Sequence, residues 1–204
     1  MIAIVNYGSG NTRAIANIYQ RLKIPTLLAS SPSDLEGVQR IILPGVGSFD
    51  QTMQQLLDSG LRDALEARVL RDGLPFLGIC VGMQLLAKRS DEGGLPGLGW
   101  IDAEVKRFDG SNFHQRTHLP HMGWNDEVPV HEDPLFAGFQ GGASFYFLHS
   151  YYMRCHDASD VLAETEYGGR FTCAVRRRNI WGVQFHPEKS HAAGVRLLEN
   201  FASA

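Results

Sequence analysis

Short apolar runs alternate with amphipathic stretches through the first part of the chain. Three runs have the length and composition of buried strands: residues 2–7, 25–29 and 40–43. Between these runs, apolar side chains recur at helical spacing over residues 12–22, and after them over residues 49–71, with a break at Ser59-Gly60. Strands that alternate with helices at this spacing predict βαβ units and a parallel sheet.

A fourth apolar run, residues 74–77, leads into Gly78-Ile79-Cys80-Val81-Gly82, and a helical pattern follows over residues 83–88. A strand that turns sharply into a helix with a nucleophile at the corner is the elbow arrangement of G-x-S-x-G sequences, here with cysteine in place of serine. The glycines allow a tight bend, and N–H groups at the helix start favour a thiolate and can stabilise an oxyanion. The alternative for Cys80 is a small buried core residue, as free cysteines often are.

The pattern changes after residue 92, where short segments of β composition follow one another. These segments are residues 100–108, 128–130, 145–154, 161–167, 171–177 and 180–185. Gly168-Gly169 is typical of a hairpin turn, and residues 189–202 predict a closing helix with Val195, Leu198 and Phe201 on one face. We therefore expect one α/β domain over residues 1–204. It has an open, mostly parallel central sheet flanked by helices and additional antiparallel strands in the C-terminal half.

The glycine-rich loops at residues 44–47 and 78–82 each follow a parallel strand, so both lie at the edge where open α/β sheets bind ligands. A later apolar strand ends in His186-Pro187-Glu188. Residues two apart on an extended chain lie on one side, so Glu188 can orient the His186 imidazole, and His186 can serve as the base for Cys80. Taken alone, the pair fits a surface contact, but an elbow cysteine in the same chain favours a catalytic triad.

Composition narrows the classes of function. The 204 residues are 44% hydrophobic and 20% charged, with a net charge of −3, so the chain has no basic excess for nucleic acid or an anionic membrane. Three widely spaced cysteines and an N-terminus without signal-peptide features indicate a reducing, cytoplasmic location. His114, His118, His121 and His156 lack the convergent spacing of a zinc site, so we expect no metal and no cofactor.

These motifs resemble the class I, or triad, glutamine amidotransferases. The resemblance is carried by the elbow with Met83-Gln84, the Pro44–Phe49 loop and the His186-Pro187-Glu188 string. Residues 120–125 and 145–151 further resemble, within that family, the glutaminase subunits of imidazole glycerol phosphate synthases, and the resemblance runs the whole length of the chain. It implies that the Cys80 thiolate attacks the carboxamide carbon of L-glutamine, with His186 and Glu188 completing the triad.

The resemblance also assigns residues to binding roles. It implies that the oxyanion lies near the backbone of Gly45, Val46, Gly47 and Val81, and that glutamine is bound by Gln84, Ser150 and Tyr151. The ammonia then passes to a cyclase subunit, a (β/α)₈ barrel that forms a heterodimer with the glutaminase in histidine biosynthesis. The residues implied to face that barrel are Met122, Trp124, Asn125, Tyr146 and Lys189. Composition alone favours a core role for such Met and aromatic side chains, although these types are also enriched at interfaces.

Three other interpretations remain open at this point. A paralogous glutaminase could supply ammonia to another acceptor, such as an amidino-sugar synthase. A non-catalytic module could retain the fold, although the intact Cys80, His186 and Glu188 set argues against it. A different cysteine hydrolase of the same fold is disfavoured by Gln84 and by residues 145–151.

Overall fold

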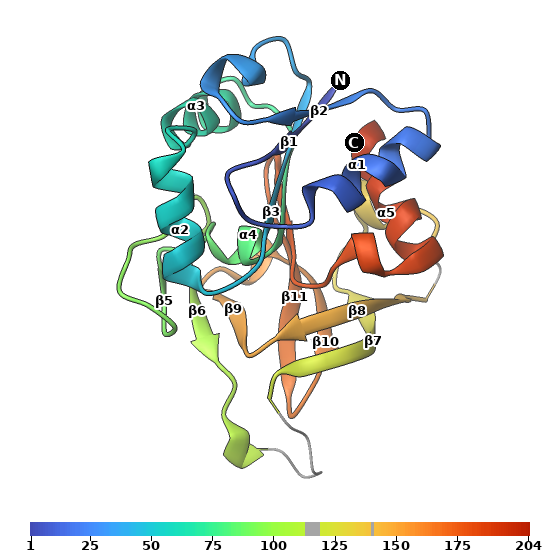
Figure 1. The fold of residues 1–204 in the computed structure, drawn as a ribbon. Coiled ribbons are helices and arrows are strands. Elements are labelled where there is room, and N and C mark those ends of the chain that lie inside the picture. Colours follow the sequence, from blue (N-terminus) through green and yellow to red (C-terminus); the bar gives the residue numbers. More distant parts are fainter. Residues whose placement is uncertain (113–118, 140) are drawn as a thin grey trace.

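The computed structural model describes residues 1–112, 119–139 and 141–204. In Figure 1 the central strands stand between two layers of helices. Helices α2 (Phe49–Asp58) and α3 (Arg62–Glu66) cover one side, and α1 (Thr12–Arg21) and α5 (His191–Ser203) cover the other. A π-helical turn, η2 (Ala67–Arg71), extends α3, so the predicted broken helical pair over residues 49–71 is confirmed.

The parallel part of the sheet holds the three loops that matter for chemistry. Its strands run in the order β2-β1-β3-β4-β12 and are β2 (Thr26–Ala29), β1 (Ile2–Val5), β3 (Arg40–Gly45), β4 (Phe76–Cys80) and β12 (Ile180–Val183). Strand β4 lies between β3 and β12, with Cys80 opposite Gly45 and Ile79 opposite Val183. Because these strands are parallel, the chain segments after Gly45, Cys80 and Val183 leave the sheet at one edge, as expected from the sequence.

Antiparallel strands continue the sheet in the C-terminal half, which confirms the predicted fold class. The path beyond β12 is β11 (Arg170–Arg177), β10 (Val161–Glu166), β7 (His121–Pro129) and β8 (Ala143–His149). Three strands join from the side: β5 (Arg89–Ser90), β6 (Ala103–Arg107) and β9 (Tyr151–Cys155). Short 3₁₀ turns link these elements: η1 (Pro32–Leu35), η3 (Gly110–Asn112), η4 (Pro134–Phe136), η5 (Ala158–Asp160) and η6 (Pro187–Lys189).

Two strand predictions were wrong in their bounds. The single strand predicted over residues 145–154 is two strands, because β8 pairs with β7 whereas β9 pairs with β6 and β11, and the chain changes partners at Ser150. Only residues 128–130 were predicted as a strand in the region of β7, which in fact begins at His121. Gly123, Asn125 and Asp126 hid this strand, and pairing with β8 over residues 121–127 stabilises it.

The helix predicted over residues 83–88 was also wrong, because α4 spans only Val81–Gln84. The carbonyls of Leu85 and Leu86 accept hydrogen bonds from the N–H groups of Leu98 and Ile101, so the chain turns away from the helical path. A helix of four residues adds little macrodipole beside Cys80.

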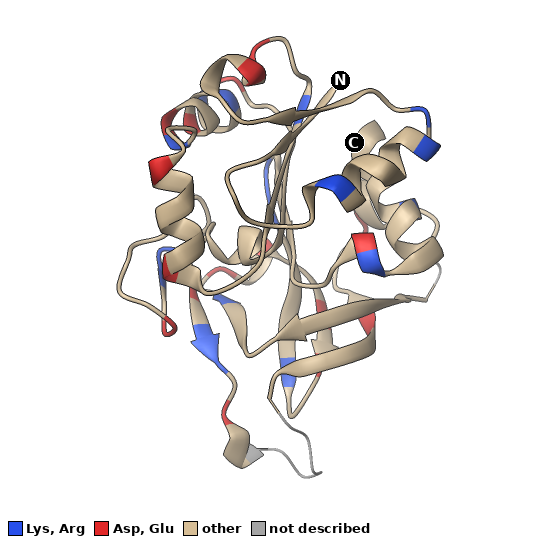
Figure 2. Cartoon of the chain, viewed as in Figure 1, with Lys and Arg blue, Asp and Glu red and all other residues tan. Residues whose placement is uncertain are grey.

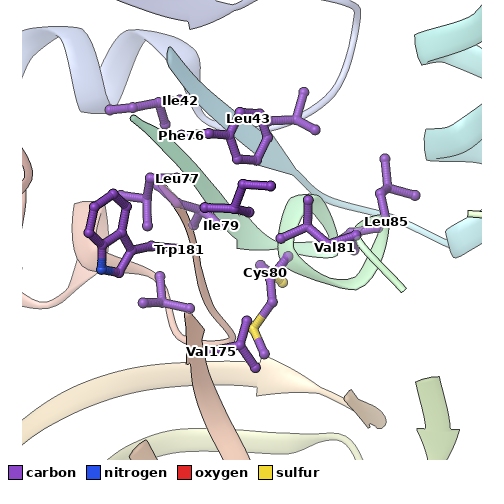
Figure 3. Packing of buried hydrophobic residues seen from close by; sticks show 14 of the residues in the cluster. Ile42, Leu43, Phe76, Leu77, Ile79, Cys80, Val81, Leu85, Val175 and Trp181 are labelled. Carbon is purple, nitrogen blue, oxygen red and sulfur yellow. The ribbon is translucent and has the colours of Figure 1, made fainter. Parts of the chain in front are cut away.

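The core packs on both faces of β4. Figure 3 shows Cys80 at the turn between Ile79 and Val81, with Leu77, Val175 and Trp181 packed nearby. These side chains are almost fully buried. Burying one such aliphatic or aromatic side chain contributes about 1.5–3 kcal/mol, so the apolar strands stabilise the edge on which the turn depends.

Charged residues of both signs are spread over the outer helices and loops, while the central strands are mostly uncharged (Figure 2). Within the described part of the chain, no helix is both long enough and apolar enough to span a membrane. The side chain of Glu127 on β7 is an exception to the surface placement of charge, because it is fully buried. Its Oε1 accepts the Ala143 N–H at 3.1 Å, and its Oε2 has no hydrogen-bond partner among the described residues.

Burial raises the pKa of Glu127 to about 7, and the nearby Asp126 charge adds to this effect. The folded state therefore holds a proton that the unfolded state has already lost between about pH 4.5 and pH 7. Folding stability from this group is complete below that range and is lost as the pH rises through it.

Replacement Glu127→Gln should remove this loss, because the amide is neutral at every pH and its oxygen can still accept the Ala143 N–H. We expect thermal unfolding of the variant and the wild type to coincide near pH 4.5, with the variant melting several degrees higher at pH 8. Exposed Glu132→Gln is the matched control and should show no such pH-dependent gain. Equal melting temperatures of Glu127→Gln and wild type at pH 8 would contradict the assignment of a raised pKa.

Candidate active site

Cys80 stands at a sharp turn between β4 and α4. Its backbone angles, φ 56° and ψ −114°, lie in a region that non-glycine residues rarely adopt. Glycines on both sides make the turn possible: a Cβ on Gly82 would lie 1.9 Å from the Leu43 oxygen, and one on Gly78 would lie 2.6 Å from the Gly82 oxygen. The strained corner is thus as the sequence predicts, although Cys80 itself is only 4% exposed and lies at the base of a cavity.

The His186 imidazole joins the sulfur to a carboxylate. Its Nδ1 lies 2.9 Å from Glu188 Oε1, and the ring lines the same cavity as the Cys80 sulfur. Burial alone would lower the pKa of His186, but the hydrogen bonds and the negative charges of Cys80 and Glu188 outweigh it and raise this pKa to about 10. The structure therefore favours a protonated, positively charged His186 ring beside the sulfur.

Glu188 is held by a second donor from the other end of the chain. Asn11 Nδ2 donates to Glu188 Oε1 at 2.9 Å. Burial alone would raise the pKa of Glu188, but the hydrogen bonds from His186 and Asn11 and the His186 charge outweigh it, so its pKa lies below the ordinary value. Asn11 lies at the N-cap position of α1, but its side chain makes no cap hydrogen bond and instead serves this carboxylate.

A cavity of about 270 Å³ opens above the sulfur. Its lining includes nine of the residues that the sequence suggested: Val46, Gly47, Cys80, Val81, Gln84, Ser150, Tyr151, His186 and Lys189. Gly45 is not among them, since it lies beneath the elbow, where a Cβ would meet the Gly82 nitrogen at 2.5 Å. Glu188 lies behind His186 rather than in the lining.

The loop expected to bind the oxyanion is tied down by the loop after β1. Ser9 Oγ accepts the Val46 N–H at 2.9 Å and donates to the Val46 carbonyl at 2.8 Å. The Tyr7 hydroxyl also donates to the Pro44 carbonyl at 2.7 Å. In this conformation the Val46 N–H is engaged by Ser9, so it is not available to an oxyanion in the cavity.

Several lining residues were not predicted: Glu92, Pro120, Leu148 and His149. Glu92 enters the cavity because its Oε2 accepts the Phe49 N–H at 2.8 Å, and Asp50 accepts the N–H groups of Gly94 and Leu95. These contacts between distant loops bring Glu92 to the site, and no local pattern marks it. Gln184 Nε2 lies 3.8 Å from Cys80 Sγ, and its place two residues before His186 was a usable signal.

The residues expected to face a partner lie on the β7–β8 hairpin and beside it. Met122 and Trp124 are 65% and 48% exposed, so the core role that composition favoured is wrong for both. Trp124 stacks on His191, and Lys189 Nζ lies 5.6 Å from the centre of the Tyr146 ring. Asn125 donates to the Glu166 carbonyl at 2.8 Å, so its amide supports the neighbouring strand β10.

Among the described residues no three His, Cys, Asp or Glu side chains converge as ligands. His114 and His118 lie outside the described residues. A larger hollow of about 680 Å³ lies over residues 129–139, but it shares no lining residue with the cavity at Cys80, and its Asp133 carboxylate is engaged by Arg176 and Trp181.

Comparison with known proteins decides the family. The model of the glutamine amidotransferase class-I family matches residues 3–204. The chain belongs to the class I glutamine amidotransferases. Its fold agrees with this family: a solved structure described as a glutamine amidotransferase superposes with a TM-score of 0.76 over 100% of both chains, at 23% identity.

Three curated relatives match this amidotransferase over nearly its whole length. It is 52% identical to the imidazole glycerol phosphate synthase subunit HisH of Bdellovibrio bacteriovorus, over 99% of both chains. The subunit HisH of Leptospira interrogans is 47% identical over 100% of both chains, and HisH 2 of Pseudomonas aeruginosa is 44% identical over 98% of both.

The elbow of this amidotransferase should not tolerate a methyl group at Gly82, because the Leu43 carbonyl occupies that space. We expect Gly82→Ala to lower the free energy of unfolding by about 3 kcal/mol in urea titrations, since backbone atoms must move apart. Gly94→Ala is the matched control, because nothing lies within 4 Å of a Cβ there. A Gly82→Ala variant as stable as Gly94→Ala would show that the close approach at the elbow is wrong.

Proposed function

We propose that this chain is the glutaminase subunit of an imidazole glycerol phosphate synthase. It hydrolyses L-glutamine to L-glutamate and ammonia and passes the ammonia to a cyclase subunit, which makes imidazole glycerol phosphate and aminoimidazole carboxamide ribotide in histidine biosynthesis. The observation that carries the proposal is His186, whose ring is hydrogen-bonded to Glu188 and lines the same cavity as Cys80, in a chain that shares about half its residues with a HisH subunit.

The first half of the reaction uses the thiolate and the imidazolium. Cys80 Sγ attacks the carboxamide carbon of glutamine, and the C=O electrons move to the oxygen, which becomes an oxyanion. The Nε2–H of His186, on the ring nitrogen not used by Glu188, gives its proton to the amide nitrogen, the C–N bond breaks and ammonia leaves. A γ-glutamyl thioester remains on Cys80.

Water completes the cycle. The His186 ring, neutral after the first step, accepts a proton from water as the water oxygen attacks the thioester carbon. The C–S bond then breaks, glutamate leaves, and the thiolate again faces an imidazolium. Glu188, held by Asn11, stabilises the imidazolium and keeps its Nδ1 protonated through both steps.

The oxyanion needs N–H donors that the resting site supplies only in part. Val81 and Gly47 border the cavity, whereas the Val46 N–H is bonded to Ser9. We assign the donor role to the backbone of Val81 and of residues 45–47, with the Ser9–Val46 contact as the interaction that must yield for Val46 to take part.

Glutamine recognition is assigned to the cavity wall. Gln84, Ser150 and Tyr151 lie along it with Glu92, whose carboxylate suits the α-ammonium group of the substrate. The Gln84 amide nitrogen donates hydrogen bonds to the Tyr151 carbonyl and to Gln184 Oε1. These bonds hold the Gln84 side chain in place as part of the cavity wall that contacts the substrate.

The partner surface adjoins this cavity. Met122 is opposite Leu148 in the β7–β8 register and Trp124 is opposite Tyr146, so these four side chains share one face of the hairpin. Leu148 and Lys189 both line the cavity, which makes the exposed apolar face continuous with its mouth. An apolar partner surface here excludes water from the path of the ammonia. In water most ammonia is protonated, and the protonated form is not nucleophilic. We propose that a (β/α)₈ cyclase covers Met122, Trp124, Asn125, Tyr146 and Lys189.

Reconstitution tests the function directly. The purified chain, mixed with a cognate cyclase, glutamine and the phosphoribulosyl-formimino substrate, should yield imidazole glycerol phosphate and glutamate in equal amounts. Cys80→Ala should lower glutamate release by about a thousandfold or more, while added ammonium salts restore cyclisation. Glutamate release without imidazole glycerol phosphate would instead favour the paralogous glutaminase for another acceptor, such as an amidino-sugar synthase.

Substrate binding offers a separate test at Glu92. Glu92→Gln should raise KM for glutamine about tenfold and leave kcat nearly unchanged, because the amide loses the charge that attracts the ammonium group but can still accept the Phe49 N–H. The neighbouring carboxylate Asp91 pairs with Lys106 outside the cavity lining, so Asp91→Asn is the control. Equal KM values for Glu92→Gln and the control would remove Glu92 from the binding site.

A further inference from the structure

A row of four buried polar side chains runs from strand β7 to the Cys80 sulfur, and of these only Gln84 has a place in the steps above. His121 on β7 and His149 on β8 are direct partners in the strand register. Gln84 follows the elbow, and Gln184 precedes His186 by two residues. All four side chains are shielded from solvent, so each hydrogen bond among them must be satisfied inside the protein.

The Tyr151 carbonyl determines which atoms donate and which accept in the hydrogen bonds of His149 and His121. Burial lowers the pKa of His121 to about 4 and that of His149 to about 3, so both rings are neutral near pH 7. A carbonyl oxygen only accepts, so His149 Nδ1 donates to it at 2.7 Å and the Nε2 of the same ring is an acceptor. His121 Nδ1 therefore donates to that Nε2 at 3.1 Å.

The same carbonyl determines which atoms donate and which accept in the hydrogen bonds of Gln84 and Gln184. Gln84 Nε2 donates one hydrogen to the Tyr151 oxygen at 3.1 Å and the other to Gln184 Oε1 at 3.0 Å. With its oxygen engaged, Gln184 presents its amide nitrogen to Cys80 Sγ at 3.8 Å. An amide is nearly symmetric in shape, so without this constraint its oxygen could face the sulfur equally well.

We infer that Gln184 is a further catalytic residue, which donates an N–H hydrogen bond to the Cys80 thiolate, and that His149 is a positioning residue acting through Tyr151 and Gln84. The catalytic part of this inference rests on the proposed glutaminase function. When His186 gives its proton to the leaving amine, its charge is lost, and Gln184 remains as a donor to the sulfur. The same donor stabilises the thiolate that leaves when the thioester is hydrolysed.

Alkylation of the isolated chain by iodoacetamide tests the donor without glutamine. The thiolate attacks the CH₂ carbon, the C–S bond forms, the C–I bond breaks and iodide leaves. Burial raises the pKa of Cys155 to about 12 and that of Cys173 well above its ordinary value, so neither of these thiols competes with Cys80 for the reagent near pH 7.5. Peptide mass mapping with Cys80→Ser as the blank assigns the adduct.

Gln184→Met keeps the length of the side chain and removes the donor, and we expect its alkylation rate at pH 7.5 to fall about tenfold. Gln184→Glu should react more slowly still, because a carboxylate oxygen then faces the sulfur. Tyr152→Phe is the matched control. The Tyr152 ring packs on Phe108, which also packs against His149, but the Tyr152 hydroxyl is not part of the row. A folded Gln184→Met protein that reacts at the wild-type rate overturns the inference.

The positioning role of His149 has its own pair of variants. His149→Leu removes the donor to the Tyr151 carbonyl and should slow alkylation, whereas His149→Asn places an amide nitrogen near the position of Nδ1 and should restore most of the rate. Melting curves establish that each variant is folded, and equal rates for His149→Leu and wild type overturn this role.

With the cyclase present, kcat for glutamate release should fall in parallel with the alkylation rate, with KM for glutamine little changed. A wild-type chain that releases no glutamate, together with slow alkylation of Gln184→Met, refutes the proposed function and supports the donor.

Discussion

The site depends on one buried imidazole that holds two partners. His186 lies beside the sulfur at the end of β4 and contacts a carboxylate two residues farther along its own chain, and the pairing of β12 with β4 brings the ring to the sulfur. Burial would by itself keep the ring neutral, yet the two negative groups outweigh it and leave the ring charged. Fold and chemistry are therefore coupled through the register of two parallel strands.

The elbow shows what this arrangement requires of the backbone. Cys80 adopts positive φ, and the strand β3, the elbow and the chain after it approach so closely that Gly45, Gly78 and Gly82 leave no space for a side chain. Backbone strain of this kind costs about 1–3 kcal/mol and persists only when packing on every side holds it. The apolar strands beneath the elbow provide that packing, which explains why a reactive sulfur lies at the edge of the most deeply buried part of the sheet.

Local patterns in the sequence predicted the parallel core, the sharp turn at Cys80 and the His186–Glu188 pair, because each depends on neighbouring residues. Contacts between distant segments could not be predicted in this way. Asn11 serves Glu188 instead of capping α1, Ser9 holds Val46, and Glu92 reaches the cavity only through its contact with the start of α2. The short helix after the elbow has the same cause, since carbonyls at Leu85 and Leu86 bond to a loop more than ten residues away.

The charge on His186 is the claim from which the rest of the account follows, and ¹⁵N NMR of the histidine ring nitrogens measures it directly. At pH 8 in the wild-type chain, both ring nitrogens of His186 should carry protons, in keeping with a pKa of about 10. The buried rings of His121 and His149 should be neutral in the same spectrum and serve as internal references. A neutral His186 ring at pH 8 would contradict the thiolate–imidazolium pair.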